Sequence, residues 1–315
     1  MREFLIEKSE SGQTLIKYLA RLMKEAPQSF FYKMLRKKNI TLNGKKADGH
    51  EMIKPGDVVK IFVSEDTFSK FEGSVCIDYQ DSGDFTLDII YEDENIALIN
   101  KPAGILSQKS RPEDVSINEY CISYFIKNGF YDPNVAGAFK PSVCNRLDRN
   151  TTGILLVGKS LLGTRAVNAA LHDRTLHKYY VCPVKGLIND EIHLKGFLDK
   201  DHITNKVEIN KDGRGCEIET VIKPLRTNGK YSLIEVELLT GKSHQIRAHL
   251  ASIGHPLLGD NKYGDFELNK SLKLRYQLLH SYKVIMPDFD DEMSYLSGRV
   301  FETGIPYIMN ALLGD

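Results

Sequence analysis

The sequence predicts an α+β protein: a mostly antiparallel, mixed β-sheet core flanked by helices, preceded by a small N-terminal α/β domain. Three observations predict this class. Strand-like segments follow one another through short turns after residue 86, helical segments are interspersed irregularly instead of in strict βαβ order, and charge is divided unevenly along the chain. We expect domains at residues 1–64 and 86–315, with an acidic linker over residues 65–85.

Charge segregation supports this division. The 315 residues include 42 Lys/Arg and 42 Asp/Glu, so the formal net charge is zero. Residues 1–62 hold 13 basic and 7 acidic side chains, residues 63–100 hold 1 and 10, and residues 101–315 hold 28 and 25. A neutral chain argues against a nucleic-acid partner, since such proteins are usually basic, but the basic N-terminal segment removes that objection.

Composition also indicates the compartment. The longest apolar stretches, such as residues 154–157, are far shorter than the roughly 18 residues of a membrane span, and charges interrupt the N-terminus where a secretory signal would be apolar. The five cysteines are widely spaced and form no Cys-x-x-Cys pair, which indicates reduced thiols and no zinc knuckle. We therefore expect a cytoplasmic protein with no membrane partner and no metal.

The N-terminal segment predicts two helices and a short sheet. Apolar residues recur at helical spacing over Thr14–Ala26 and again over Ser29–Lys38. A strand-like ITLNGKK then turns at Asn43-Gly44, and the PGD at residues 55–57 leads into the strand VVKIFV.

Basic residues gather at two places in this module. They end the second helix and follow the hairpin turn: Arg36, Lys37 and Lys38, then Lys45 and Lys46. A charge run at a helix end is usually a solvated cap that complements the helix dipole, but the second cluster so close by predicts one basic surface for RNA. Over about residues 12–62 the module resembles the S4-type RNA-binding module, in which a helix pair and such a loop present basic residues to RNA.

Strands dominate from Phe85 onward. TLDIIYEDENIALINKPAG predicts two strands around an acidic turn, SINEYCISYFIKN a helix, GILLVGKS a buried strand and LLGTRAVNAALHD a second helix. Further strands are expected at about residues 176–185, 216–225 and 231–239, followed by a helix over HQIRAHLASIG that ends at Gly254.

One stretch stands out for chemistry, CNRLDRNTTG at residues 144–153. A carboxylate flanked by Arg146 and Arg149 is held ionised because nearby positive charge favours the anion. An ionised and rigidly held carboxylate is a competent nucleophile, so Asp148 is the candidate. The local pattern leaves a simpler interpretation open, in which the segment is a turn stabilised by an ordinary salt bridge.

The RLDRNTTG within this stretch, placed before an apolar strand, resembles the R-L-D-R-x-T-[ST]-G signature of the RluA family of pseudouridine synthases. Four more segments agree with that family: YEDENIALINKPAGILS (91–107), HKYYVCPVKG (177–186), TGKSHQIRAHLASIGHPLLGDNKYG (240–264) and QLLHS (277–281). The resemblance covers about residues 86–286 and implies the pseudouridine synthase fold. It also implies an isomerase that acts on RNA as a monomer and uses no cofactor.

The resemblance implies a role for each candidate residue. Asp148 would be the nucleophile, Arg247 would pair with it, and Tyr180 would stack on the uracil. Arg146 would fill the gap left by the flipped base, and we group Arg149 with it among the residues that bind substrate. Without the resemblance, Tyr180 would be a core strand aromatic, Arg146 an exposed arginine and Arg247 part of a weak surface ion pair.

One position departs from the family pattern, because Asn145 stands where many relatives have His; it is not the nucleophile, so the departure concerns only how the loop packs or meets RNA. TGKS at residues 240–243 suggests a phosphate loop, but Val236 occupies a position where that loop requires Gly. The expected target by resemblance is large-subunit ribosomal RNA. Transfer RNA, a catalytically silent RNA-binding or ribosome-assembly factor, and an RNA-binding nucleosidase are the alternatives that the sequence leaves open.

Overall fold

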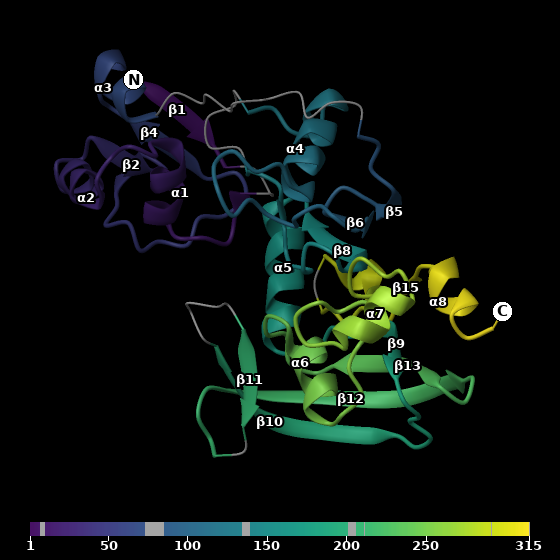
Figure 1. Ribbon diagram of the computed structural model, residues 1–315. Coiled ribbons are helices and arrows are strands. Elements are labelled where there is room, and N and C mark those ends of the chain that lie inside the picture. The colour runs from purple at the N-terminus through teal and green to yellow at the C-terminus, as the bar shows by residue number, and fades with distance from the viewer. Residues whose placement is uncertain are drawn as a thin grey trace. The chain divides into compact units, whose positions relative to one another are not determined.

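The computed structural model describes residues 1–6, 10–72, 85–133, 139–200, 206–210, 212–290 and 292–314 (Figure 1). The chain divides into two compact units. The first contains residues 1–85 together with 120–142 and 159–162, and the second contains residues 86–119, 143–158 and 163–315. Of the linker expected over 65–85, residues 73–84 lie outside the described residues.

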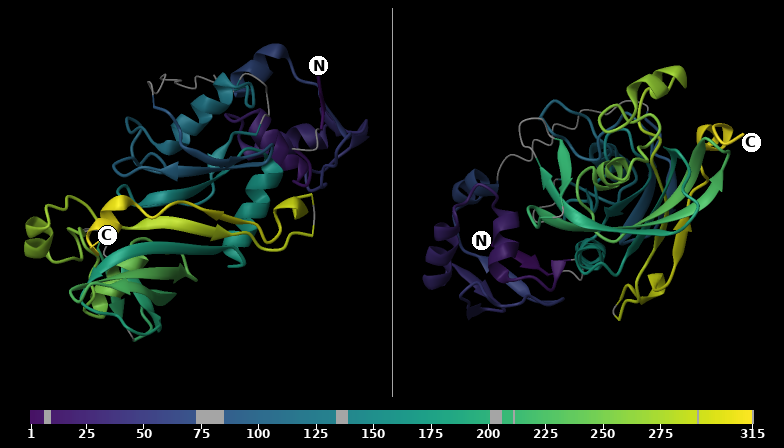
Figure 2. Two further views of the ribbon diagram at one scale, coloured as in Figure 1. Left: turned by 90° about the vertical axis from the view of Figure 1, so that its right-hand side faces the viewer. Right: turned by 60° about the horizontal axis from the view of Figure 1, so that its bottom comes forward.

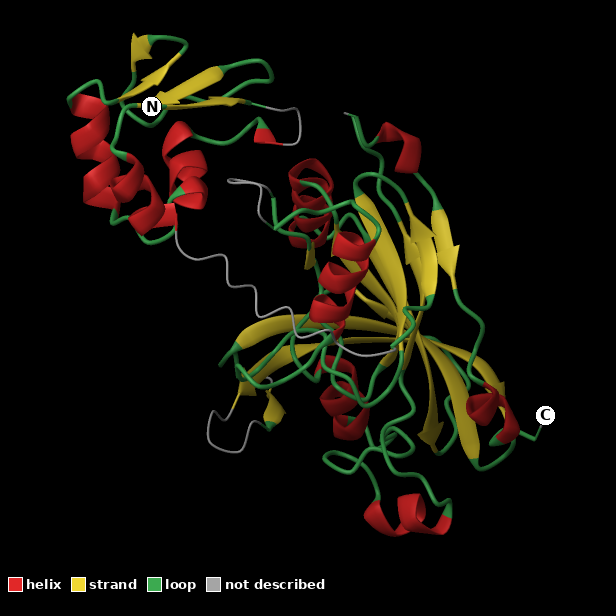
Figure 3. Cartoon of the chain, turned by 90° about the horizontal axis from the view of Figure 1, so that it is seen from above, coloured by secondary structure: helices red, strands yellow, loops and turns green. Residues whose placement is uncertain are grey.

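The N-terminal module is a small sheet with helices on one of its sides (Figure 3). Its elements are β1 (Arg2–Leu5), α1 (Leu15–Leu22), α2 (Gln28–Arg36), β2 (Ile40–Leu42), β3 (Lys45–Lys46), β4 (Val58–Ile61) and α3 (Glu65–Glu72). The strand order is β1-β4-β2-β3, and every pair is antiparallel. The apolar side chains that predicted the two helices, such as Leu15 and Leu19 of α1 and Leu35 of α2, are buried in one core.

The helix ends and the hairpin follow from local chemistry. Helix α1 stops at Leu22, four residues before the expected end, and α2 begins directly after Pro27, which disfavours helix in the residue before it. Helix α2 ends with Lys38 in the left-handed region (φ 57°), and the Asn39 N–H donates to the Met34 carbonyl at 2.9 Å, as in a Schellman ending. Asn43 and Gly44 both have positive φ, as expected for a two-residue hairpin turn.

Residues 65–72 differ from the expected acidic linker because they form helix α3. Phe68 of this helix is buried and stacks on Phe4, with ring centroids 6.0 Å apart, and Phe71 packs on Phe30 at 4.7 Å. The acidic composition of the segment hid the two aromatic residues that attach it. The N-terminal module therefore extends to Glu72.

The second unit is built on the expected mixed, mostly antiparallel sheet, of which the structure describes eleven strands. They are β5 (Ile89–Glu92), β6 (Ile96–Lys101), β7 (Ser142–Val143), β8 (Thr152–Gly158), β9 (His177–Lys185), β10 (Ile192–Lys200), β11 (Val207–Asn210), β12 (Cys216–Thr227), β13 (Tyr231–Leu238), β14 (His280–Ile285) and β15 (Val300–Glu302). The order is β11-β10-β12-β13-β9-β14-β8-β6-β5, with β15 on β14 and β7 on β8, and β14 runs parallel to β8. Long strands β12 and β13 lie side by side (Figure 2).

Helices complete the chain: α4 (Ile117–Lys127), α5 (Leu161–His172), α6 (Gln245–Ser252), α7 (Phe266–Ser271), α8 (Tyr307–Ala311) and a 3₁₀ turn at Ser294–Leu296. Helix α6 packs on β11 and β12, where its Ala248 lies against Val207 and Ile218. Within the described part of the chain, no helix is both long and apolar enough to cross a membrane. Cys121, Cys144, Cys182 and Cys216 are thiols that take part in no disulfide, and Cys76 lies outside the described residues.

Candidate active site

The loop that carries Asp148 joins β7 to β8 and is tied to its neighbours by side-chain hydrogen bonds. The Ser107 hydroxyl donates to the Leu147 carbonyl at 2.9 Å and accepts from the Leu147 N–H at 3.0 Å. The Thr151 N–H donates to the Asp148 carbonyl at 3.0 Å. These bonds leave the Asp148 side chain 26% exposed, so the carboxylate is held in place yet reachable.

A buried lysine binds backbone carbonyls of the same loop. Lys101, at the end of β6, is 0% exposed, and its ammonium donates to the carbonyls of Pro102 (2.8 Å), Arg149 (2.9 Å) and Thr151 (2.9 Å). Burial lowers the pKa of Lys101 to about 8, and the negative charge of Asp148 opposes that shift. Lys101 therefore fixes the part of the loop that follows Asp148 and joins it to the end of β6.

The loop leads into β8 at a glycine, and any larger residue there would force the neighbouring backbone to move. Gly153 has φ +100°, and a Cβ built on it would lie 2.1 Å from the Ser281 carbonyl oxygen of β14. This close approach occurs where β8 and β14 pair in parallel, since Gly153 lies opposite Ser281. The last Gly of RLDRNTTG is thus required by the backbone contact that places the loop on the sheet.

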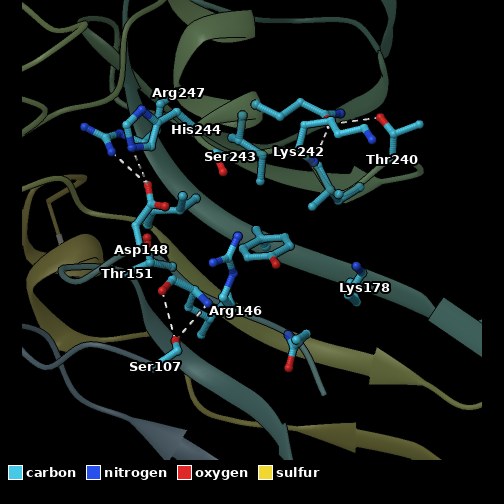
Figure 4. Close-up of a pocket in the computed structure, with 18 of the residues that line it drawn as sticks. Ser107, Arg146, Asp148, Thr151, Lys178, Thr240, Lys242, Ser243, His244 and Arg247 are labelled. Carbon is cyan, nitrogen blue, oxygen red and sulfur yellow. Dashed lines mark hydrogen bonds and ion pairs between the residues drawn. The ribbon is translucent and has the colours of Figure 1, made fainter. Parts of the chain in front are cut away.

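Arg247 links two carboxylates. Its Nη1 donates to Asp148 Oδ2 at 2.8 Å, which is the pairing expected from the sequence (Figure 4). Its Nε and Nη2 donate to the two oxygens of Asp260 at 2.7 and 2.9 Å, in the bidentate geometry that arginine forms with carboxylates. Because Asp260 is 0% exposed and also accepts from the N–H groups of Lys262 and Tyr263, it orients Arg247 rigidly toward Asp148.

The pKa values of this pair follow from burial and mutual charge. Burial alone would lower the pKa of Arg247, but the hydrogen bonds and charges of Asp260 and Asp148 outweigh it and raise the pKa. Burial alone would raise the pKa of Asp260, and Arg247 reverses that effect, so the pKa falls below its ordinary value. Both groups stay charged at neutral pH.

A histidine lies on the other side of Asp148. His244 Nε2 is 3.8 Å from Asp148 Oδ2, and His244 Nδ1 is 2.9 Å from the Tyr263 hydroxyl. That hydroxyl accepts from the Val207 N–H at 2.9 Å, so its own hydrogen is available to His244 Nδ1. Burial lowers the pKa of His244, Asp148 opposes the shift, and Arg247 adds to it. The neutral ring with hydrogen on Nε2, facing Asp148, satisfies all of these contacts.

Tyr180 comes to the site on β9. It is buried, lines the same cavity as Asp148, and lies opposite Ser281 in the β9–β14 pairing. Burial raises the pKa of its phenol, and the negative charge of Asp148 raises it further, so the hydroxyl stays protonated.

Gln245 fixes the loop at residues 240–244, which lines the site. Its Oε1 accepts from the Thr240 hydroxyl at 2.9 Å and from the Lys242 N–H at 3.1 Å, while its Nε2 donates to the Glu219 carbonyl and to the Thr220 hydroxyl, both at 3.0 Å. The side chain uses its full amide to join this loop to β12. The loop is therefore ordered before any ligand arrives.

These residues surround one cavity of about 950 Å³. Among the described residues, the charged side chains that line it are six cations and a single carboxylate: Arg146, Arg149, Arg174, Lys178, Lys242 and Arg247, against Asp148. This charge suits an anionic ligand, and the volume lies at the upper end of the range for ligand-binding pockets.

Comparison with known proteins agrees with this geometry. The family model described as RNA pseudouridylate synthase matches residues 95–252, about half of the chain. The chain is 32% identical over 243 residues to ribosomal large subunit pseudouridine synthase D of Borreliella burgdorferi, covering 73% of this chain and 72% of that protein. It is 31% identical over 290 residues to ribosomal large subunit pseudouridine synthase C of Rickettsia bellii, covering 88% and 91%.

The chain belongs to the RNA pseudouridylate synthase family. The synthase is accordingly an isomerase that converts uridine to pseudouridine in RNA. A solved structure of human RNA pseudouridylate synthase domain containing 4 matches with a TM-score of 0.53 at 20% identity, over 70% of this chain and 90% of that one, and supports the fold.

In the synthase structure, the positive charge beside Asp148 comes from a different residue than the sequence led us to expect. Arg146 and Arg149 flank Asp148 in the sequence, but both side chains are exposed, and among the described contacts neither forms an ion pair with it. Successive residues of a loop point in different directions, so the cation at Asp148 comes from Arg247, 99 residues away. Arg146 still lines the cavity, where its side chain can meet a ligand (Figure 4).

Asn145, the departure from the family pattern, has a structural contact. Its side-chain Oδ1 accepts from the Leu156 N–H of β8 at 2.8 Å. Next to it, the Cys144 N–H donates to the Leu156 carbonyl at 2.7 Å. Asn145 therefore attaches the start of the Asp148 loop to β8, which accounts for a polar side chain at this position.

The expected RNA-facing residues of the N-terminal module are placed at the surface. Arg36, Lys37 and Lys38 are exposed at the end of α2, and Lys45 and Lys46 are exposed on β3. They form no part of the cavity, and all belong to the first unit of the chain.

Sequence reasoning missed three residues of the synthase site: Lys101, His244 as a neighbour of Asp148, and Asp260. Each lies inside one of the family motifs, NKPAG, TGKSH or GDNKYG. The local sequence does not show that Lys101 and Asp260 are buried, or that His244 lies half-buried beside Asp148. Among the described residues, no group of three or more His, Cys, Asp and Glu side chains is arranged to hold a metal ion.

Proposed function

We propose that this synthase modifies uridines in large-subunit ribosomal RNA, with Asp148 as its nucleophile. The observation that carries this proposal is the cavity in which Asp148 is the one carboxylate that the described residues contribute, among six cations. A polyanion is attracted to such a cavity, and its reactive nucleotide then meets the single nucleophile. Arg247 and Asp260 keep that nucleophile oriented.

The reaction conserves the atoms of the nucleotide. The N1–C1′ glycosidic bond breaks, the uracil turns in place, C5 bonds to C1′, and the proton lost from C5 is balanced by a proton gained at N1. Asp148 attacks at the sugar or at the base and is released when the C5–C1′ bond is complete. No electron is gained or lost overall, so these steps require only positioning, a nucleophile and proton transfer.

The remaining residues position the nucleotide. A uridine in folded RNA has to leave its stack before it reaches a carboxylate that lines a cavity. Tyr180 offers an aromatic face beside Asp148 for the flipped uracil, and the exposed guanidinium of Arg146 is available to fill the gap that the base leaves. Arg149 lies on the same loop and would contact the backbone.

The choice of ribosomal RNA follows the names of the relatives from Borreliella burgdorferi and Rickettsia bellii. Transfer RNA is the competing target. Pseudouridine mapping of total RNA from cells with and without the gene separates the two. We expect signals to disappear from large-subunit ribosomal RNA, and loss confined to transfer RNA would contradict the proposal.

We further propose that the N-terminal module is an S4-type RNA-binding domain of a monomeric, cytoplasmic enzyme. Its two basic clusters are exposed on neighbouring elements, α2 and β3. Neutralising Arg36, Lys37 and Lys38 to Gln should weaken RNA binding and flatten its salt dependence by about 0.7 to 0.9 for each phosphate that is no longer neutralised.

A matched control for this triple variant neutralises Lys17, Lys24 and Lys54, which are exposed in the same module but outside the two clusters. Both triple variants lose three charges, so a general loss of net charge affects them alike. Equal RNA affinity and equal salt dependence of the two variants would contradict a specific RNA-binding surface at α2 and β3.

A further inference from the structure

Lys178 is a cavity residue to which the reaction described above gives no role. It lies on β9 two residues before Tyr180, so both side chains leave the same face of the strand, separated by about 6.6 Å along it. Both line the cavity that contains Asp148. Figure 4 shows Lys178 apart from Asp148, on the part of the wall that leads away from the nucleophile.

The ammonium of Lys178 has no counter-charge within the described protein. Burial lowers its pKa, and no described carboxylate or carbonyl accepts a hydrogen bond from it. Lys178 is half-buried in the cavity wall, and even partial removal of an ammonium from water is unfavourable unless the charge is paired. Lys101, which is fully buried, is by contrast bonded to three carbonyls. The partner of Lys178 is therefore expected outside the polypeptide.

The surroundings of Lys178 are also cationic. A Cβ built on Gly241 would lie 3.4 Å from Lys178 Nζ, which places the ammonium directly against the loop at residues 240–243. The next residue, Lys242, lines the same cavity, and Gln245 holds this loop through the Lys242 N–H. Asp148, the one carboxylate that the described part of the chain brings to the cavity, is already engaged by Arg247.

We propose that Lys178, together with Lys242, forms a phosphate subsite that binds the RNA backbone beside the target uridine. This inference rests on the proposed function of the same cavity. A lysine ammonium is a common point-charge partner of phosphate, whereas a uracil carbonyl is neutral and supplies no charge to balance the two lysines that line this cavity. With the uracil stacked on Tyr180, Lys178 lies about 6.6 Å further along β9, and this spacing separates the uracil from the RNA backbone that Lys178 binds.

The subsite gives the TGKS segment a role. These residues fail the spacing of a nucleotide phosphate loop. In the structure Gly241 leaves room for the approach of Lys178, and Lys242 supplies the second cation. The segment would thus meet a phosphate diester through two lysine side chains and not through a ring of backbone N–H groups.

Lys178→Met tests the subsite, with Lys230→Met as its matched control. Lys230 is exposed at the β12–β13 turn, whereas the cavity-lining residues of β13 are at the opposite end of that strand, about 23 Å away. Binding of an unmodified large-subunit ribosomal RNA transcript is measured from 50 to 200 mM salt. Removing one phosphate interaction lowers the salt slope by about 0.7, so wild type should lose about 2.6-fold more affinity than Lys178→Met over this range.

Thermal unfolding separates binding from folding. Because Lys178 has no partner among the described residues, Lys178→Met should melt at or above the wild-type temperature. A clearly lower melting temperature would show a structural lysine and overturn the proposal. Lys178→Arg keeps the charge and should retain the wild-type salt slope.

Neutral methylphosphonate linkages, placed singly on either side of the modified uridine, identify the partner. One of them should slow single-turnover modification by wild type yet have a much smaller effect on Lys178→Met. If every linkage affects both proteins equally, Lys178 contacts none of these phosphates and the phosphate subsite is wrong. A wild-type enzyme that modifies no uridine would instead overturn the proposed function, while salt slopes equal in wild type and Lys178→Met overturn the subsite alone.

Discussion

Asp260→Asn removes one negative charge from behind the nucleophile and leaves the size of the side chain unchanged. The carboxylate of Asp260 accepts four hydrogen bonds, two from Arg247 and two from the N–H groups of Lys262 and Tyr263. An asparagine amide has one oxygen and one NH₂ group, so in either orientation it directs a donor at a donor. Arg247 then keeps only Asp148 as its counter-charge.

The structure sets the size of the effect. Asp260 is 0% exposed and Arg247 is 7% exposed, so the pair is shielded from water. Removing one partner of a buried ion pair destabilises a protein by about 3 to 5 kcal/mol. Because Arg247 loses its bidentate hold, the Asp148 carboxylate also loses its fixed orientation, and a misplacement on the order of 1 Å lowers a reaction rate about 100-fold.

Chemical denaturation and single-turnover modification at saturating RNA measure the two effects. Asp265→Asn is the matched control, because Asp265 forms an ion pair with Lys185 whose side chains are 32% and 50% exposed. Such surface pairs contribute about 0 to 1 kcal/mol, and asparagine still caps helix α7. If Asp260→Asn is as stable and as active as Asp265→Asn, the positioning role of Asp260 is refuted.

Three further predictions concern the support of the site. Lys101→Met removes three hydrogen bonds to the Asp148 loop and should lower the single-turnover rate more than RNA affinity; an unchanged rate would contradict its role. Gly153→Ala should unfold at a much lower denaturant concentration than Gly213→Ala. Both glycines have positive φ, but only at Gly153 would the added methyl group collide with a backbone oxygen. Equal denaturation midpoints of the two variants would contradict this prediction. His280 has its pKa lowered to about 4 by burial, so the unfolded chain binds its proton first as pH falls from 6.5. Unfolding free energy should drop by about 3 kcal/mol more in wild type than in His280→Asn between pH 7 and 4, and parallel pH profiles would disprove this.

Local patterns predicted many elements of the fold. Helical spacing located α1 and α2, the Asn43-Gly44 pair located a hairpin turn, and β9, β12 and β13 are present where strands were expected. The parallel pairing of β14 with β8 could not be predicted, because it joins His280 to Thr152 and depends on packing far along the chain. Helix α3 was missed because its charged residues outnumber the two aromatic residues that attach it.

The candidate site was predictable where a motif carried it. Asp148, Arg247 and Tyr180 were taken from family resemblance, and the structure brings all three to one cavity. Lys101 and Asp260 could not be recognised, because their importance comes from burial beside partners 48 and 13 residues away. Burial of this kind is a property of the assembled sheet and leaves no mark in the neighbouring sequence.

The central claim is that Asp148 drives the isomerisation of uridine, and RNA carrying tritium at C5 of uridine tests it most directly. Joining C5 to C1′ releases that hydrogen, so wild type should transfer tritium to water, while Asp148→Asn should bind the same RNA and release none. Tritium release by Asp148→Asn at the wild-type rate would contradict the account. So would a wild-type product in which the tritium stays in free uracil, since that is the outcome of a nucleosidase.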